Sequence, residues 1–446
     1  MNEELMKAQQ LFNKGRYDDS LEAYRTIMDH SSDEESIRMA ASMAFYIRIS
    51  KLTGLYEPDE MAEYMALCLQ LEEPLFLLRA VLHFPVKEGV TGIPETLDAA
   101  RKLSDEGSTL AMMLLGQLYG SGKLVEKDEK KALEWFEKGA GLGDPVCMMK
   151  AAGILDDADF EENDPGKAAA YQKRAAELGF PDALYSEGRD AFDGKGQEKD
   201  IRKAYELMDR AAGSGLTEAA VDMWRQYLDY PDEIGAAIPD FSEGRLLDHL
   251  KLAAYEGNDD AMLELGRYYC EQKQFSLAEK YYKEAMDAGN YDAPLELSSI
   301  YLVIKKSEKD HKKGIAILTK AARDDDNPEA MAVLGSCYLQ GLGVRMNRKQ
   351  GMKWLRKSAD LGCPTALSSL GSVLLDEGKV KESLKYLKKA ADMGDPEGLF
   401  LLGGLYLDGA GVEKNRETAA FYFRRAALQG MDEAREILGR MTLGEI

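Results

Sequence analysis

The side chains that most often carry out catalysis or bind metals are few and widely scattered in this chain. Its histidines share no metal-ligand spacing such as H-E-x-x-H, and they are His30, His83, His249 and His311. The cysteines stand in no paired or nucleophile motif, and they are Cys68, Cys147, Cys270, Cys337 and Cys363. We therefore predict no catalytic residue, no metal site and no cofactor, and we expect that the protein is not an enzyme.

Three arginines at one position of a repeated segment are the first candidates for a binding site: Arg189, Arg225 and Arg267. Stacked at one height, their guanidinium groups could hold the carboxylates of an acidic peptide. Alternatively, each arginine pairs with an acid four residues further along its own helix, as ordinary surface pairs do. Those acids are Asp193, Asp229 and Glu271. The apolar candidates beside the arginines are Tyr185, Val221, Leu228 and Leu263.

A second candidate is the stretched segment of residues 231–241, where one repeat is longer than the others. It carries Ile234, Ile238 and Phe241 beside two prolines. Insertions in a repeat array emerge on one face and often carry function, so this segment could dock a partner. Alternatively, it folds back to cover an apolar joint left by the irregular Trp224. The sequence favours neither interpretation.

These candidates lie on a two-helix unit that recurs ten times, with anchor residues 32 to 42 positions apart. The anchors are Ala111, Cys147, Ala183, Ala219, Ala261, Ala293, Ala330, Ala366, Gly398 and Ala434. A near-fixed period of this size predicts a solenoid of helical hairpins, because one hairpin cannot bury its apolar face alone. The expected fold is all-α, a right-handed superhelical solenoid of antiparallel helix pairs.

The first helix of each unit follows the pattern A-x-x-x-L-G-x-x-Y. Glycine inside a helix costs about 1 kcal/mol relative to alanine, so its return predicts a close crossing of the paired helix. The glycines concerned are Gly116, Gly188, Gly266, Gly335, Gly371, Gly403 and Gly439. A Gly-x-Gly turn follows several first helices, but no Gly-Lys-Ser/Thr accompanies it, so we interpret it as structural.

The second helix follows A-x-x-[large]-x-x-[KR]-A-A-x-x-G, and the whole pattern resembles the Sel-one-like repeat family, a relative of the tetratricopeptide repeat. The resemblance covers about residues 75–446 and departs at Trp224 and Ser298, which replace the helix glycine. We expect residues 1–106 to form degenerate tetratricopeptide-like hairpins that cap the array. Residues 107–431 would be the repeat array, and residues 432–446 a C-terminal capping helix.

The resemblance implies a protein–protein interaction scaffold or adaptor that binds a peptide or protein segment in a concave groove lined by first helices. An alternative is a regulatory subunit that clamps an enzyme or signalling complex through its outer face and the 231–241 segment. A third is a hydrolase of the β-lactam-binding type, known among secreted, disulfide-linked members. Their paired cysteines are missing here, so that activity does not carry over.

The net charge of −22, from 79 acidic and 57 basic side chains, argues against binding nucleic acid or anionic lipid by bulk attraction. It favours solubility and is compatible with a basic partner. No apolar run reaches the ~18 residues of a membrane span, and the N-terminus does not resemble a secretory signal. Scattered, odd-numbered cysteines suit reduced thiols, so we expect a cytoplasmic location and an unidentified protein or peptide partner.

Overall fold

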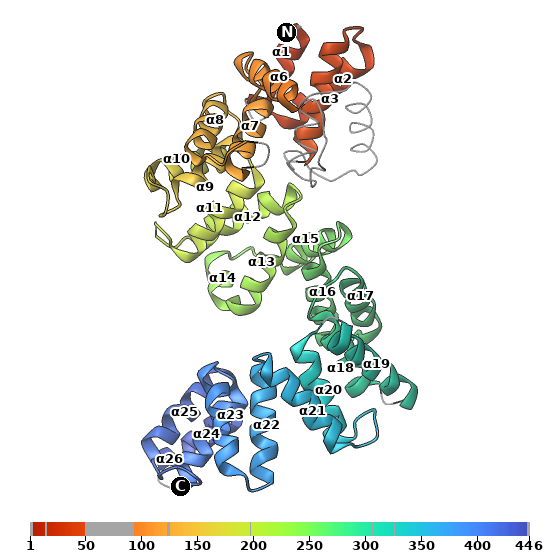
Figure 1. Ribbon diagram of the computed structural model, residues 1–446, viewed down its shortest axis with the longest axis vertical. Coiled ribbons are helices and arrows are strands. Elements are labelled where there is room, and N and C mark those ends of the chain that lie inside the picture. Colours follow the sequence, from red (N-terminus) through yellow and green to blue (C-terminus); the bar gives the residue numbers. More distant parts are fainter. Residues whose placement is uncertain are drawn as a thin grey trace. The chain divides into compact units, whose positions relative to one another are not determined.

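The computed structural model describes residues 3–13, 16–49, 93–122, 125–196, 198–305, 307–324 and 326–443. It divides into two compact units, Met1–Ala261 and Met262–Ile446. In the described ranges the regular elements are helices that follow one another along each unit (Figure 1). None of these helices combines the length and the apolar character that crossing a membrane requires. The predicted fold class, an all-helical solenoid of antiparallel pairs, is confirmed.

The first unit begins with helices that precede the regular repeats: α1 (Glu3–Asn13), α2 (Tyr17–His30), α3 (Glu34–Ile49) and α6 (Ile93–Asp105). Three regular pairs follow: α7 (Thr109–Ser121) with α8 (Glu129–Gly141), α9 (Pro145–Leu155) with α10 (Pro165–Glu177), and α11 (Pro181–Asp193) with α12 (Ile201–Gly213). The fourth repeat pairs α13 (Thr217–Asp229) with α15 (Glu243–Tyr255), and the short α14 (Pro231–Ala237) lies between them in sequence.

Helix α16 (Asp259–Glu271) begins in the first unit and continues into the second. The second unit contains α17 (Phe275–Asp287), α18 (Ala293–Ser299), the π-helix η1 (Ile300–Ile304), α19 (Glu308–Asp324), α20 (Pro328–Gln340), α21 (Arg348–Asp360) and α22 (Pro364–Asp376). It ends with α23 (Val380–Asp392), α24 (Pro396–Asp408), α25 (Arg416–Leu428) and α26 (Asp432–Leu443). The predicted division at residues 106 and 431 stays a prediction, and much of residues 1–106 lies outside the described ranges.

The joints between repeats are built by a short sequence of turn and cap residues. Gly143 ends a repeat with φ of 93°, a left-handed conformation that favours glycine. Asp144 then caps α9, its Oδ1 accepting a hydrogen bond from the Cys147 backbone nitrogen at 2.9 Å. Pro145 occupies the first turn, where a missing N–H is harmless. The anchor that follows, Cys147, is fully buried, as the repeat pattern predicts.

The helix glycines mark close crossings of the two helices in each repeat, which confirms the prediction for most of them. A Cβ added at Gly116 would lie 2.5 Å from Cε1 of Phe136, and one at Gly188 would lie 2.6 Å from Cγ of Met208. The prediction is wrong for Gly439, where an added Cβ would meet nothing within 4 Å. Within the described residues, α26 has no second helix of its own repeat to cross it.

The sixth repeat keeps the close crossing although Ser298 replaces the glycine. Here the glycine lies on the partner helix: a Cβ at Gly314 on α19 would come within 3.2 Å of the Ser298 carbonyl oxygen. The helix α18 then continues as the π-helix η1, a form that is uncommon and short in proteins. The two helices of this repeat therefore still approach closely, with the glycine on the second helix in place of the first.

A carboxylate on α17 anchors the end of this irregular helix. Glu279 accepts hydrogen bonds from Lys283 at 2.7 Å, from Lys305 at the end of η1, and from the Tyr301 hydroxyl. Partial burial acts to raise the pKa of Glu279, but these three hydrogen bonds outweigh it and lower the pKa to about 2. Glu279 therefore remains ionised and joins the fifth repeat to the sixth.

Candidate functional site

The three arginines of the predicted row pair with acids on the next first helix. In the first unit, Nε of Arg189 lies 3.9 Å from Oδ2 of Asp222, and Nη2 of Arg225 lies 3.4 Å from Oδ1 of Asp260. In the second unit, Nε of Arg267 lies 3.0 Å from Oε1 of Glu296. Each arginine therefore links one repeat to the following one.

The predicted pairing with Asp193, Asp229 and Glu271 along the same helix is wrong. Side chains on a helix lean towards its N-terminus, so an arginine leans away from an acid four residues further on. A basic residue placed before the acid is also the less favourable order for such a pair. Because neighbouring first helices lie beside one another, the guanidinium groups reach the next helix instead.

Arg189 belongs to a cluster with an aromatic ring on its own helix. The Tyr185 hydroxyl donates a hydrogen bond to the Asp222 carboxylate, and the guanidinium carbon of Arg189 lies 5.8 Å from the centre of the Tyr185 ring. Burial and the contact with Asp222 raise the pKa of Tyr185 to about 12, so the hydroxyl stays protonated. The cluster holds Asp222 between a hydroxyl donor and a cation.

Arg267 sits between two carboxylates in the second unit. Its Nη1 lies 3.2 Å from Oε1 of Glu264, a side chain that is almost completely buried, and its Nε bonds Glu296. Burial acts to lower the pKa of Arg267, but the hydrogen bond to Glu296 and the charge of Glu264 outweigh it and raise the pKa. The arginine thus neutralises a buried acid, which is a structural task.

The apolar candidates beside the arginines divide into buried and exposed side chains. Val221 and Leu263 are buried, so in this structure they pack inside the array and present no surface. Tyr185 is half-buried and Leu228 is 48% exposed. Their role in binding stays a prediction, and only Tyr185 and Leu228 are placed where a partner could touch them.

The stretched segment of the fourth repeat folds back onto helices α12 and α13. Ile234 on α14 is fully buried, while Ile238 and Phe241 are half-buried. The Phe241 ring stacks on Tyr227 of α13 with 4.9 Å between ring centres, and it meets the edge of Tyr205 on α12 at 5.9 Å. The segment therefore folds back in this structure, and Ile234 is out of reach of a partner in it; that the segment covers a joint at Trp224, or docks a partner, stays a prediction.

Polar contacts fasten the same segment to α12. Nζ of Lys199, just before the helix, lies 2.8 Å from Oε2 of Glu233. The Arg202 guanidinium donates a hydrogen bond of 3.1 Å to the carbonyl oxygen of Ala237. An aromatic contact adds to these: Tyr230, just before the segment, packs edge-on against Phe192 of α11 with 5.8 Å between the ring centres. The segment is thus held at both ends and along its middle.

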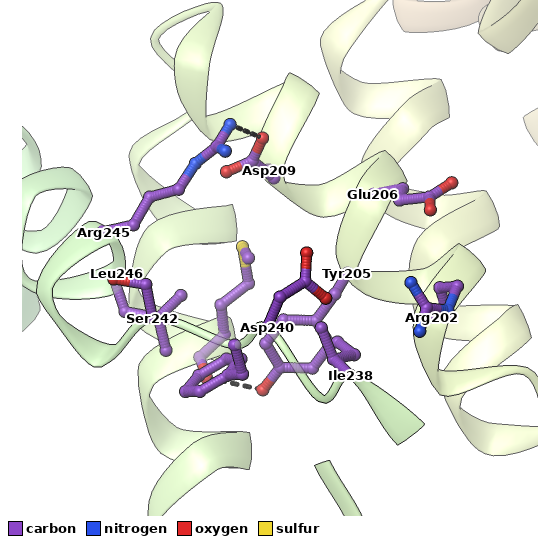
Figure 2. Close-up of a pocket in the computed structure, with 11 residues that line it drawn as sticks. Arg202, Tyr205, Glu206, Asp209, Ile238, Asp240, Ser242, Arg245 and Leu246 are labelled. Carbon is purple, nitrogen blue, oxygen red and sulfur yellow. Dashed lines mark hydrogen bonds and ion pairs between the residues drawn. The ribbon is translucent and has the colours of Figure 1, made fainter. Parts of the chain in front are cut away.

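The folded segment leaves a pocket of about 250 Å³ against the second helices, which we call the loop pocket (Figure 2). Its lining residues are Arg202, Tyr205, Glu206, Asp209, Met223, Ile238, Asp240, Phe241, Ser242, Arg245 and Leu246. Tyr205, Met223 and Leu246 are buried apolar or aromatic side chains, and the Tyr205 hydroxyl donates to the Met223 carbonyl oxygen at 3.0 Å. The pocket therefore has an apolar wall and charged groups around it.

One acidic side chain of the loop pocket, Asp209, already has two partners within the protein. Asp209 pairs with Arg245 through one oxygen and with Nε2 of His249 through the other, at 3.0 Å in the second case. Partial burial acts to raise the pKa of Asp209, but the His249 hydrogen bond and the Arg245 charge outweigh it and lower the pKa. Figure 2 shows the Asp240 carboxylate directed into the pocket, between this pair and the side chains of Arg202 and Glu206.

The sequence did not reveal the loop pocket, although it marked the segment that forms it. The length of the fourth repeat was the available signal, since the neighbouring repeats are shorter. Across the described part of the chain, no three histidine, cysteine or acidic side chains gather in a way that could hold a metal ion. The chemistry of both candidate surfaces is therefore that of charge pairs and aromatic contacts.

This arrangement of stacked helix pairs defines a helical-repeat protein. The Sel1 repeat model matches residues 109–144, 148–180, 182–216, 305–326, 328–363, 369–395 and 396–431, and a tetratricopeptide repeat model matches residues 260–288. Since these matches cover half of the sequence, the chain belongs to the Sel1 repeat family, as the resemblance of its motifs predicted. Repeat proteins of this type generally mediate protein–protein interactions.

The first of three similar solved structures supports the fold. A protective antigen of uropathogenic Escherichia coli with an SLR fold is 25% identical, with a TM-score of 0.58 over 85% of this chain and 82% of that one. A Sel1 repeat protein from Oxalobacter formigenes is 21% identical, with a TM-score of 0.45 over 82% of this chain and 99% of that one. Yeast Tom70 is 14% identical, with a TM-score of 0.41 over 99% and 95%. A search of curated proteins gives no match.

Proposed function

We propose that the protein is a scaffold or adaptor that binds a peptide or protein segment on the first-helix face of its third and fourth repeats. This first-helix face is the exposed side of α11 and α13 that carries Tyr185, Arg189, Arg225 and Leu228. The observation that supports it most is the row of solvent-accessible ion pairs between successive first helices. Arg267 makes a similar pair with Glu296 within the second unit, but it also neutralises the buried Glu264.

The existing pairs do not prevent the arginines from binding a partner. The side chains of Arg189, Arg225 and Arg267 are 55%, 42% and 39% exposed. For Arg189 and Arg225, whose acids are also solvent-accessible, such ion pairs are each worth about 0–1 kcal/mol, so exchanging one carboxylate for another costs little. A guanidinium can also bond its present acid and a second acceptor together, because it has five N–H donors. The half-buried Tyr185 and exposed Leu228 add apolar contact.

Affinity capture from a lysate of the source organism tests the proposal. The test variant changes Arg189 and Arg225 to glutamine, which removes the charge without placing acids together and leaves the structural Arg267 intact. The control variant changes two exposed arginines of second helices to glutamine: Arg174 and Arg424. We expect the wild type and the control to capture the same proteins and the test variant to lose them. Equal capture by all three would eliminate the first-helix face.

The alternative is a regulatory subunit that holds an enzyme or signalling complex through its outer face. The observation in its favour is the loop pocket, which the stretched fourth repeat forms against the second helices. Deleting the segment would remove the buried Ile234 and uncover the ring of Tyr205, so a point change is a cleaner test. Asp240→Lys should release the captured complex under this alternative and leave capture unchanged if the first-helix face alone holds the partner.

A further inference from the structure

The excess of acidic over basic side chains lies in one of the two units only. The first unit, Met1–Ala261, contains 52 Asp and Glu against 29 Lys and Arg, a formal charge of −23. The second unit, Met262–Ile446, contains 27 acidic and 28 basic side chains, a formal charge of +1. The first unit therefore attracts cationic partners, and the second has no such bias.

The loop pocket lies in the acidic unit and combines two chemical features. One wall is apolar and aromatic, formed by Tyr205, Met223, Ile238 and Phe241. The lining also includes the carboxylates of Glu206 and Asp240, both on exposed residues. An aromatic wall beside a carboxylate is the surrounding that a long cationic side chain prefers, because its stem is apolar and its end is charged.

The basic side chains that line the pocket already have partners within the protein. Arg245 pairs with Asp209, which also bonds His249, and Arg202 donates to the Ala237 carbonyl oxygen. Within the described ranges, neither Glu206 nor Asp240 has a hydrogen bond or ion pair to a protein side chain. These two carboxylates are therefore available to a ligand at no cost of breaking an existing pair.

We propose that the loop pocket binds the side chain of an arginine in a basic segment of a protein partner. The stem of the arginine packs against Ile238, and its planar guanidinium lies against the half-buried Phe241 ring. Its N–H groups donate to the Asp240 and Glu206 carboxylates. Arginine fits better than lysine, because a planar cation can stack on a ring and bond two carboxylates together.

The charge of the first unit adds to this contact from a distance. At physiological ionic strength, charges within about 8 Å act on one another without strong screening. The excess of acids thus speeds the approach of a basic segment, while the pocket selects the residue that enters. This inference goes beyond the proposed function, since the loop pocket and the first-helix face share no residue and separate variants address them.

Saturation-transfer NMR with acetyl-arginine methylamide as the probe tests the pocket on the full chain. Asp240→Lys and Glu206→Lys should each weaken binding about fivefold, the loss expected for one partly exposed charge pair. The matched control is Glu134→Lys on α8, which makes the same charge change at an exposed position away from the pocket. Its binding should stay close to that of the wild type.

A second probe separates the charge from the shape of the ligand. Acetyl-citrulline methylamide has nearly the same size as the arginine probe but no charge, and it should bind at least fivefold more weakly. The proposal is overturned if the arginine probe does not bind the wild type. It is equally overturned if citrulline binds as well, or if Glu134→Lys weakens binding as much as the pocket variants do.

Discussion

Replacing Gly351 by alanine tests whether the two helices of a repeat touch through their glycines. Gly351 on α21 faces Gly335 on α20, and a Cβ at 351 would lie 2.8 Å from the backbone oxygen of Gly335 and 2.7 Å from Cγ of Leu339. Leu339 can change its rotamer, but the carbonyl belongs to a helix and cannot move alone. The two helices must therefore separate by about 0.6 Å to reach an ordinary contact distance.

The expected change in the free energy of unfolding for Gly351→Ala combines two opposing effects. Forcing a packed pair apart costs about 3 kcal/mol, the upper part of the range for overpacked cores, because backbone must move. Alanine is better than glycine inside a helix by about 1 kcal/mol. The net loss expected for Gly351→Ala is therefore about 2 kcal/mol. Gly153 on α9 is the matched control: an added Cβ there meets nothing within 4 Å, so Gly153→Ala should stabilise by up to about 1 kcal/mol.

Urea unfolding followed by far-UV circular dichroism measures both variants on the full chain. Repeat arrays can unfold in parts, so hydrogen exchange over residues 328–360 and 145–177 should accompany it. We expect faster exchange in the first range for Gly351→Ala and unchanged or slower exchange in the second for Gly153→Ala. An equal rise in stability in both variants would refute the close crossing, because it would show room for a methyl group between the helices.

Three further predictions concern the two units separately. Phe241→Ala removes the ring stacked on Tyr227, so we expect a loss of about 2 kcal/mol and faster proteolysis within residues 230–242, measured by limited digestion. The pKa of Glu279 is lowered from its usual value of 4.5 to about 2. Its contribution to the free energy of unfolding is therefore complete above pH 4.5 and is lost as the pH falls towards 2. Glu279→Gln should remove the part of the loss of stability between pH 4.5 and 2 that Glu279 causes. If the urea midpoint of the variant falls with pH as steeply as that of the wild type over this range, the prediction is contradicted. Asp144→Ala removes a buried N-cap and should cost about 1–2 kcal/mol, seen as faster exchange at the start of α9.

The fold could be predicted from the sequence because the same packing requirements recur in many repeats. Each anchor must be small and buried, as Cys147 is, and each helix glycine must admit a neighbour, as Gly116 admits Phe136. The exchange at the sixth repeat was not predictable from one position, since the glycine moved to Gly314 on the other helix. A repeated pattern shows where helices meet, but not which of the two supplies the space.

The candidate sites were less predictable, for two physical reasons. Periodicity placed Arg189 and Arg225 on one face, but it carried no information on which residues of the next first helix lie opposite them, so their partners Asp222 and Asp260 were missed. The stretched segment has no counterpart in other repeats from which its path could be inferred. Its burial of Ile234 depends on contacts with α12 and α13 that form only in three dimensions.

Site-specific photocrosslinking tests the proposed scaffold function most directly. A benzoylphenylalanine at Ser186, beside Arg189 on α11, reports on the first-helix face, and one at Lys173 reports on the exposed side of α10. In a lysate of the source organism, the account predicts a crosslinked protein partner from position 186 and none from position 173. A partner crosslinked only from position 173, or from neither position, would contradict it.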